Sequence, residues 1–353
     1  MDRRRPTSSD VARAAGVSRT TVSFVLNDRA DARISSATRR RVLDAAEELG
    51  YRANVPARQL AAGTSQTIGL VLRQSPEHVA NDALLPDTLR GLAWAARGGD
   101  FRVLVEPLPP GTRSYVDLVR SRQVDGIVVS GPRSDDTALI GRSDGMPLVL
   151  QGTIDGSAVP SVDIDNRTAA RDAVDHLIDL GHRRIGCITN ASLEYTAARD
   201  RAAGYRDALA DAGLMSEPGL LVEGDHDPQS GHDAMQALLA EPDPPTGVFV
   251  GSDVVAFGVF GALREAGLRV PHDVSVVGFD DIPLAGYTDP PLTTIRVPAY
   301  ELGAAAGRVL LDLVAGRSVK AMTRLPAPLI LRGSTAPPAT TGVTPADYAV
   351  QAR

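Results

Sequence analysis

Residues 7–27, TSSDVARAAGVSRTTVSFVLN, have the pattern of two short helices joined at a glycine. Thr7 and Asp10 are spaced as a capping box, in which the hydroxyl and the carboxylate satisfy free amides of the first helical turn. Gly16 suits the turn, because a positive φ costs glycine little, and Ser18 is placed to cap the second helix. The apolar positions expected to be buried are Val11, Ala12, Ala15, Val22, Val25 and Leu26. The segment predicts a helix-turn-helix, with an ordinary helical hairpin as the alternative.

The residues that follow extend this helical unit. Ser35 is a good N-cap for a third helix over 36–49, and Gly50 marks its end. Residues 1–62 contain 12 Arg and 7 acidic residues, a net charge of +5, whereas the remaining 291 residues contain 25 basic and 36 acidic residues, a net of −11. This asymmetry indicates that the N-terminal unit meets a polyanion and that the rest of the chain does not. A helix-turn-helix of this charge is typical of a protein that reads the major groove of double-stranded DNA.

The chain resembles the lactose-repressor (LacI/GalR) family of bacterial transcription regulators along almost its whole length. The N-terminal segments that carry the resemblance are DVARAAGVSRTTVSFVLN, ISSATRRRVLDAAEELGY and NVPARQLAAG. The later ones are PSVDIDN, HLIDLGHRRIGCI, RDRAAGYRDAL, SDVVAFGVFGALREAGLRVPHDVSVVGFDDIPLAGYTDPPLTTIRVP and ELGAAAGRVLL. The resemblance implies a helix-turn-helix DNA-binding domain (1–52), a hinge helix or linker (53–65) and a two-lobed effector-binding and dimerisation domain (66–333). Residues 334–353 show no periodicity and are expected to form a disordered tail.

The body alternates apolar runs with helical patterns. Strands are expected at 67–72, 101–105, 126–130, 147–150, 184–189, 219–222, 247–250 and 274–279. Helices are expected at 86–97, 166–180, 196–212, 229–240 and 253–266. Alternating strands and helices form parallel sheets covered by helices on both faces. The predicted fold is therefore α/β: an all-α helix-turn-helix head and a two-lobed body with parallel sheets. By resemblance, the body is of the periplasmic-binding-protein type, with a small molecule between the lobes.

The resemblance also assigns residues of the head to DNA contacts. Arg19 and Thr20 take the base-reading positions, where an Arg can donate to guanine O6 and N7; contact of Arg19 with phosphate only is the alternative. Phe24 departs from the family type, which has an Arg there, so Phe24 either packs on a thymine methyl or covers the domain core. The short donors at phosphate-contact positions, each of which could equally be only a cap or a core-edge group, are Thr7, Ser23, Asn27, Ser35 and Thr38. Ser18 and Tyr51 complete the set in the head.

The linker, residues 54–61, is by resemblance helical only on operator DNA. Asn54, Arg58 and Leu60 are assigned to the DNA, with Leu60 of each subunit inserted into the central minor-groove step. Such a wedge unstacks one base step at a cost of roughly a few kcal/mol and gains a bent duplex with more contact. Two chains must meet there, which implies a symmetric homodimer on a pseudo-palindromic operator. A plain flexible linker, with Leu60 touching the body, is the alternative.

Seven body residues are candidates for the effector site. Arg199 starts the RDRAAGYRDAL helix, where the family Arg donates to ligand oxygens, and Asp280 follows the strand VSVVGF at the sheet edge where ligands bind. The others are Asn81, Asp82, Gln151, His226 and Ser252. A structural Arg–Asp pair in an empty cleft is the alternative. We expect a carbohydrate effector, with a nucleoside or a protein partner as alternatives.

Composition and the lack of certain motifs exclude other classes of protein. With one cysteine, Cys187, no disulfide forms within the chain. The sequence has no signal-peptide pattern and no run of about 20 apolar residues that would span a membrane. Common nucleotide-binding, nucleophile and metal motifs do not occur, so no cofactor, metal or catalytic role is expected. We predict a cytoplasmic, homodimeric, operator-binding repressor; a sugar-binding protein or enzyme with a basic head is the alternative from another class.

Overall fold

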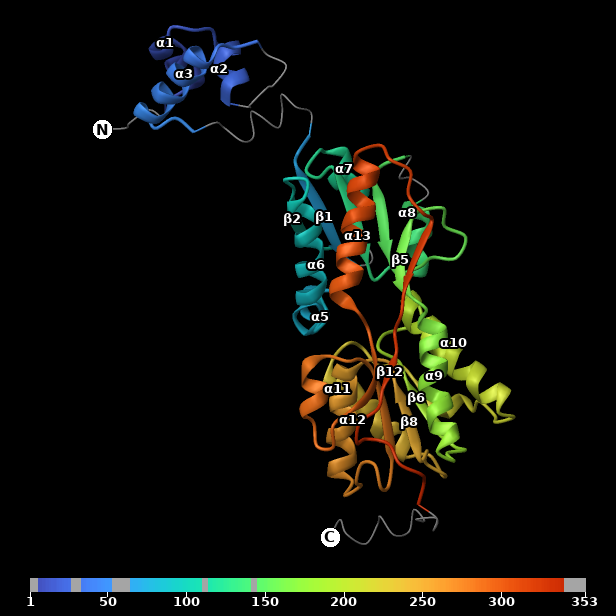
Figure 1. The fold of residues 1–353 in the computed structure, drawn as a ribbon. Helices are drawn as coiled ribbons and strands as arrows, with labels where there is room; N and C mark the ends of the chain where they lie inside the picture. Colours follow the sequence, from blue (N-terminus) through green and yellow to red (C-terminus); the bar gives the residue numbers. More distant parts are fainter. Residues whose placement is uncertain (1–5, 27–32, 53–63, 110–113, 141–144, 340–353) are drawn as a thin grey trace. The chain divides into compact units, whose positions relative to one another are not determined.

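The structure is a computed structural model that describes residues 6–26, 33–52, 64–109, 114–140 and 145–339. The chain divides into two compact units, Met1–Ser65 and Gln66–Arg353, which are called the head and the body and are described separately. Figure 1 shows the head as a group of helices and the body as two α/β lobes. No helix within these ranges combines the length and the apolar character needed to cross a membrane.

The head folds as its caps and apolar spacing predict. Its helices are α1 Ser8–Ala15, α2 Arg19–Leu26 and α3 Ser36–Glu48. The Thr7 amide donates to Asp10 Oδ2 (2.9 Å) and the Asp10 amide donates to Thr7 Oγ1 (3.4 Å), which completes the capping box. Gly16 has a φ of +64°, and the Thr38 amide donates to Ser35 Oγ (3.2 Å). The helices bury one small core of Val11, Ala12, Ala15, Val22, Val25, Val42, Ala45 and Ala46.

The first lobe of the body contains a six-stranded parallel sheet in the order β11-β5-β4-β3-β1-β2. Its strands are β1 Thr67–Leu72, β2 Arg102–Pro107, β3 Gly126–Ser130, β4 Leu148–Gln151, β5 Ser161–Ile164 and β11 Met322–Leu325. Its helices are α5 Pro76–Asn81, α6 Leu85–Arg97, α7 Val116–Arg120, α8 Thr137–Ile140 and α13 Ala299–Val314, with a 3-10 turn at Ser134–Asp136. Helices α6 and α13 pack side by side, as Figure 1 shows.

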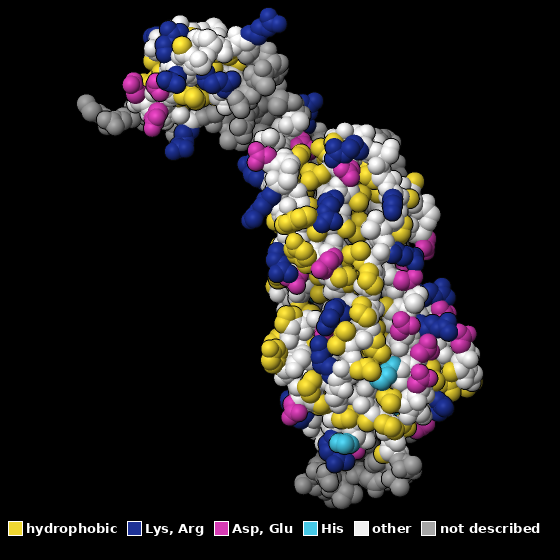
Figure 2. Space-filling view, viewed as in Figure 1, with side chains coloured by type: hydrophobic (Ala, Val, Ile, Leu, Met, Phe, Trp, Pro, Cys, Tyr) yellow, Lys and Arg dark blue, Asp and Glu magenta, His cyan; other side chains and the backbone are white. Residues whose placement is uncertain are grey.

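The second lobe contains a six-stranded sheet in the order β12-β10-β9-β8-β6-β7, in which the β10–β12 pair is antiparallel and the other described pairs are parallel. Its strands are β6 Ile185–Ile188, β7 Leu221–Val222, β8 Gly247–Val250, β9 Ser275–Asp280, β10 Thr293–Arg296 and β12 Leu329–Ile330. Its helices are α9 Asn166–Asp179, α10 Thr196–Asp211, α11 Pro228–Leu239 and α12 Asp253–Glu265, with 3-10 turns at Pro218–Leu220 and Pro283–Tyr287. Figure 2 shows interleaved acidic and basic side chains over α9 and α10.

The chain passes between the lobes after β5, after β10 and between β11 and β12. These crossings lie close together (Figure 1), and the two sheets lie end to end on either side of them. The predicted fold class is confirmed: a helical head precedes two α/β lobes with mostly parallel sheets. The sequence patterns assign no range to β5, β10, β11, β12 or α13.

The C-terminal tail begins later than the sequence predicts. The expectation of disorder from residue 334 onward is wrong for the first residues of that range. Ser334 is fully buried, and its hydroxyl donates to the Val276 carbonyl (2.6 Å). The Ala336 amide donates to Ser275 Oγ (3.0 Å), so the segment is bound to the start of β9. Its small polar residues lack an apolar pattern in the sequence, and the hydrogen bonds to β9 order them.

Candidate functional site

In the head, helix α2 presents polar side chains to the surface. Arg19, Thr20 and Ser23 are exposed, whereas Phe24 is half-buried. Ser18 caps the helix, because its Oγ accepts the Thr21 amide hydrogen (3.1 Å). The helix therefore presents an exposed cation and short hydrogen-bond donors. Base edges and phosphates accept hydrogen bonds from groups of this kind.

Several of the other residues predicted to bind DNA take part in the structure of the head itself. Thr7 and Ser35 cap α1 and α3, and Ser35 Oγ donates to Thr38 Oγ1 (3.0 Å). Tyr51 packs half-buried against the core of the head. Capping does not rule out a phosphate contact, since a hydroxyl has one donor and two acceptor positions. The predictions for Asn27, Asn54, Arg58 and Leu60, and hence for the linker, fall outside the described residues.

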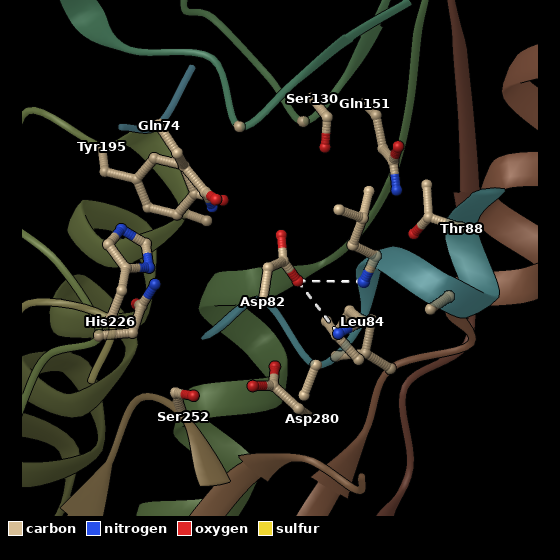
Figure 3. A pocket seen from close by; sticks show the side chains of 18 of the residues that line it. Gln74, Asp82, Leu84, Thr88, Ser130, Gln151, Tyr195, His226, Ser252 and Asp280 are labelled. Carbon is tan, nitrogen blue, oxygen red and sulfur yellow. Dashed lines mark hydrogen bonds between the residues drawn. The ribbon is translucent and has the colours of Figure 1, made fainter. Parts of the chain in front are cut away.

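The body contains a polar pocket of about 130 Å³ between the two lobes (Figure 3). Residues at or just after the carboxyl ends of parallel strands line it: Gln74 (β1), Ser130 (β3), Gln151 (β4), Asn190 (β6), Ser252 (β8) and Asp280 (β9). In open parallel sheets, ligands bind at this edge. The topology therefore directs the loops of both lobes to one site.

Six of the seven predicted effector residues line this pocket. They are Asn81, Asp82, Gln151, His226, Ser252 and Asp280. Asp82 follows α5 in the first lobe and Asp280 ends β9 in the second lobe. Figure 3 shows both carboxylates in the same part of the pocket, so the fold brings together acidic groups that are far apart in sequence.

Arg199 is the exception, and the prediction that it points into the cleft is wrong. Its guanidinium pairs with Asp155 (3.0 Å) and Asp200 (3.6 Å) outside the pocket. Arg201 lines the pocket instead, with 10% of its side chain exposed compared with 36% for Arg199. Two positions along a helix rotate a side chain by about 200°, so the two arginines of the RDR motif face opposite sides of α10.

Arg201 is held in one orientation by four neighbours. Its Nε donates to Asn166 Oδ1 (2.9 Å), and its Nη1 donates to the Gly251 carbonyl (2.5 Å). The guanidinium carbon lies 3.7 Å from the centre of the Phe279 ring, and Nη1 lies 3.8 Å from Asp280 Oδ1. Charge-assisted hydrogen bonds and stacking on an aromatic face are both strong in a buried site.

Asp163 and Asp280 are the buried carboxylates nearest this guanidinium. Asp163 accepts the Ile164 amide (2.8 Å) and the Asn166 side-chain amide (3.1 Å). Burial raises the pKa of Asp163 and of Asp280 to about 7, although the charge of Arg201 opposes the rise. Both groups therefore change charge near neutral pH.

Asp82 is a third acidic group of the pocket. Its Oδ1 accepts the amide hydrogens of Leu84 (3.0 Å) and Leu85 (3.1 Å), drawn as dashed lines in Figure 3. These bonds fix the carboxylate at the start of α6 and leave Oδ2 free of the backbone contacts that hold Oδ1. Burial raises the pKa of Asp82, whereas the two amides and Gln74 lower it.

One wall of the pocket is aromatic. The Tyr195 and His226 rings are 5.6 Å apart, and the His78 and His226 rings are 5.2 Å apart. Burial lowers the pKa of His226 to about 4, so this imidazole is neutral at physiological pH. The wall offers the tilted rings of Tyr195, His226 and His78 to a ligand, although the chain has few aromatic residues.

Three oxygens in the pocket have no hydrogen-bond partner in the described chain. They are Gln74 Oε1, Gln151 Oε1 and Asn190 Oδ1, and all three are buried. A buried polar atom left unpaired costs about 1–3 kcal/mol. A ligand with several donors would satisfy these atoms.

Among the pocket residues that the sequence patterns miss are Gln74, Asp163, Asn190, Tyr195 and Arg201. Gln74, Asp163 and Asn190 lie in or just after parallel strands, and this position is a usable signal. Arg201 shares the spacing i, i+3, i+4, i+7 with the buried residues Ala198, Ala202 and Tyr205, which distinguishes it from Arg199. No group of three or more His, Cys, Asp or Glu within the described ranges is placed to hold a metal ion.

Comparison with known proteins relates both units of the chain to one group of regulators. Residues 7–54 match the family "Bacterial regulatory proteins, lacI family", and residues 174–335 match the "Periplasmic binding protein-like domain". The chain is 38% identical over 335 residues to the HTH-type transcriptional repressor CytR of Escherichia coli (strain K12), which covers 93% of this chain and 96% of the relative. The chain belongs to the LacI family. It is a DNA-binding transcriptional regulator of the LacI type, with an effector-binding domain.

Solved structures show the same likeness over head and body. The lac repressor dimer bound to operator and the anti-inducer ONPF is 31% identical, with a TM-score of 0.84, and the match covers 94% of this chain and 100% of that one. The complex of the transcriptional regulator CelR with cellobiose is 32% identical, with a TM-score of 0.72 and the same coverage. The whole architecture, and not one domain alone, is therefore that of a LacI-family regulator.

Proposed function

We propose that this LacI-family regulator represses transcription by binding a pseudo-palindromic operator as a homodimer, and that a small molecule in the pocket of Figure 3 controls its affinity for DNA. The pocket carries the proposal. Polar groups of both lobes converge there, and three of their buried oxygens lack a partner in the described chain. The likeness to a lac repressor dimer bound to operator supports the DNA partner and the dimeric state.

For the DNA interface we propose a division between base contacts and backbone contacts. Arg19 and Thr20 read bases from the exposed start of α2, and Phe24 offers an apolar edge to a thymine methyl. Leu60 enters the minor groove at the centre of the operator. The proposed phosphate and sugar contacts are Thr7, Ser18, Ser23, Asn27, Ser35, Thr38, Tyr51, Asn54 and Arg58.

For the effector we propose a carbohydrate. Asp82 and Asp280 present carboxylates from opposite lobes, and carboxylates accept hydrogen bonds from vicinal hydroxyls. Gln151, Ser252 and His226 add further polar groups around the same space. A polyhydroxylated molecule would satisfy these acceptors and contact both lobes at once.

A nucleoside is the second candidate, and the aromatic wall favours it. The rings of Tyr195, His226 and His78 are tilted against one another and form an aromatic surface on one side of the pocket. Figure 3 shows Tyr195 and His226 apart from the carboxylates of Asp82 and Asp280. A nucleobase could stack on this surface while the ribose hydroxyls donate to the carboxylates. One ligand would then use both parts of the pocket.

The coupling of ligand to DNA is proposed to act through the angle between the lobes. Beside the pocket, the Thr196 hydroxyl donates to the Pro132 carbonyl (3.1 Å), and the Ser134 amide donates to the Glu194 carbonyl (2.9 Å). These bonds join the lobes directly, so opening or closing the pocket changes them. A ligand that binds one lobe angle better than the other shifts the population of that state, with a coupling of about 1–3 kcal/mol.

The regulator is proposed to act by binding and not by catalysis, as its relatives are transcriptional regulators. We propose that it acts in the cytoplasm, where bacterial chromosomal DNA lies.

To test the proposal, the full-length protein is used to select fragments from the genomic DNA of its host, and the selected fragments are sequenced. Carbohydrates and nucleosides are then tested for release or tightening of the complex. A recurrent palindrome and at least one effective ligand are expected. Random fragments would contradict the DNA proposal, and a palindromic complex unaffected by any compound would contradict the effector proposal.

A further inference from the structure

The ionic groups of the pocket are unequally divided between acids and bases. Asp82, Asp163 and Asp280 line it, and Arg201 is the one Lys or Arg among the described residues that do so. Of the two histidines of the aromatic wall, His226 adds little positive charge, because burial lowers its pKa to about 4. His78 lies 3.4 Å from Asp225, which offsets any charge on it. When all three carboxyl groups are ionised, these four side chains leave a surplus of two negative charges.

The one guanidinium is already engaged by the protein. Arg201 donates to Asn166 Oδ1 and to the Gly251 carbonyl, lies on the Phe279 ring, and is 3.8 Å from Asp280. An incoming anion would have to compete with these contacts. The unpartnered groups of the pocket are oxygens, on Gln74, Gln151 and Asn190, which an anion cannot satisfy.

Asp82 and Asp280 approach the ligand space from different lobes. When ionised, each carboxylate raises the energy of a negative charge between them, and burial limits the screening of that charge by water. An ammonium group or a pair of hydroxyls placed there donates to both carboxylates and draws the lobes together. A phosphate or carboxylate in the same place adds repulsion to both lobes.

From this geometry we infer that Asp82 and Asp280 together restrict the pocket to neutral or positively charged ligands rich in hydrogen-bond donors, and exclude phosphorylated and carboxylated ones. The inference rests on the proposed effector function and defines its ligand class by charge. The inference applies equally to sugars and to nucleosides. In either class, the pocket is expected to bind the free compound in preference to its phosphate ester or its carboxylic acid.

The test uses ligands matched in all but charge. Glucose, glucosamine, glucose 6-phosphate and glucuronate form one set; ribose with ribose 5-phosphate, and adenosine and cytidine with their 5′-monophosphates, form others. Each compound is titrated against the full-length protein, and the melting temperature and the Kd are measured. In every set that binds, the neutral or amino compound is expected to bind at least about tenfold more tightly than its anionic partner.

Asp82→Asn tests the residue itself. Asparagine keeps an Oδ1 that can accept the Leu84 and Leu85 amides, but removes the charge. The variant is expected to reduce the discrimination against the anionic partner by about tenfold. Asp87→Asn is the matched control: Asp87 lies on the first turn of α6, is 54% exposed, and is not a pocket residue. This control should leave the discrimination unchanged.

The outcomes distinguish failure of the charge inference from failure of the proposed effector function. Anionic members that bind as tightly as their partners, or a ratio unchanged by Asp82→Asn, would overturn the inference while leaving the effector function standing. If no member of any set raises the melting temperature or changes operator binding, the proposed effector function fails and the inference fails with it. If only the neutral and amino compounds raise the Tm, and Asp82→Asn reduces this selectivity, the result supports both the effector function and the charge inference.

Discussion

Arg201 is the residue on which the polar contacts of the pocket converge. It reaches Asn166, Gly251 and Asp280 from α10, and the Phe279 ring covers one face of its guanidinium. Removing it would leave buried partners unpaired, and a buried carboxylate without its counter-charge is costly. Arg201 thus positions the acidic groups of the pocket.

We predict that Arg201→Gln raises the effector concentration needed for a response at least about tenfold. The physical reason is that glutamine cannot maintain the three contacts and the charge together. Arg199→Ala is the matched variant, because Arg199 pairs with Asp155 outside the pocket, and its response should equal that of the wild type. The measurement is operator release as a function of ligand concentration, with circular dichroism to confirm folding. The reverse result, with Arg199→Ala impaired and Arg201→Gln normal, would show that the assignment is mistaken.

Ligand affinity is predicted to rise with pH between 6 and 8. Burial raises the pKa of Asp163 and Asp280 to about 7, so both are partly protonated at pH 6. The charged groups that influence Asp280 are Arg201, Asp82 and Asp253. A donor-rich ligand stabilises the carboxylates and lowers their pKa, so binding releases protons, and affinity should increase about tenfold across this range.

Calorimetry in two buffers of different ionisation enthalpy measures this proton release directly. The prediction is a binding heat that depends on the buffer and a Kd that falls as the pH rises. His226 serves as an internal check, since its pKa near 4 means that it stays neutral over the same range. Affinity that falls with rising pH would contradict the proposed role of the two carboxylates.

At the scale of elements, close helix packing in the second lobe depends on glycine. A Cβ added at Gly258 of α12 would lie 1.7 Å from the Pro228 carbonyl oxygen of α11, whereas one added at Gly261 would lie 3.7 Å from the nearest atom, of His232. We predict that Gly258→Ala lowers the free energy of unfolding of the body by about 3 kcal/mol or more. Gly261→Ala should be neutral or gain up to about 1 kcal/mol from helix propensity.

Thermal and denaturant unfolding of the full chain measure both glycine variants. Because α12 starts beside the pocket at Ser252 and Asp253, Gly258→Ala should also weaken the effector response, in contrast to Gly261→Ala. If the two variants were equally stable, α11 and α12 would be able to move apart without loss of free energy of unfolding. That result would contradict close packing at Gly258.

Ser35 at the start of α3 has two roles that substitution can separate. Its Oγ accepts the Thr38 amide as an N-cap, and it is proposed to contact a phosphate. Ser35→Asp keeps a good cap but adds a charge that repels DNA, so the helix should stay stable while operator affinity falls about tenfold. Ser35→Ala should lower the stability of α3 by about 1 kcal/mol. Hydrogen exchange of α3 amides and operator titration are the two readouts; normal operator affinity of Ser35→Asp would leave Ser35 as a cap only.

The sequence predicts those helices and strands whose caps, turns and apolar residues lie within a few positions of one another. The capping box, the N-cap serines, the turn glycine and the apolar spacing of the head are each set by residues a few positions apart, and α1, α2 and α3 occur where these signals place them. The strands β1, β3 and β8 are short apolar runs and match their predicted ranges. In these segments the pattern and the final burial agree.

The elements without a predicted range depend on distant partners. Strand β5 has the sequence SVDI, in which polar residues alternate, and it is buried only because β4 and β11 flank it. Strands β11 and β12 come from the end of the chain and complete sheets formed much earlier in sequence. The choice between Arg199 and Arg201 is of the same kind, since only the packing of α10 decides which arginine faces the second lobe's ligand edge.

At the scale of the whole molecule, charge is separated between the two units. Residues 1–62 carry a net charge of +5 and the rest a net of −11, so DNA attracts the head and is repelled by the body. Within the body, ion pairs such as Arg167–Asp207 and Arg171–Asp211 balance charge locally on α9 and α10. We therefore expect DNA contacts only in the head and the linker, and ligand binding in the body.

Footprinting of the full-length protein on a selected genomic fragment, across a series of salt concentrations, tests the central claim most directly. We predict two protected half-sites related by a palindrome, with a hypersensitive step at the centre where Leu60 enters, and protection that an effector alters. Weak protection that ignores sequence and disappears steeply with salt would mean that the head binds by charge alone. That result would contradict the account of this protein as an operator-specific regulator.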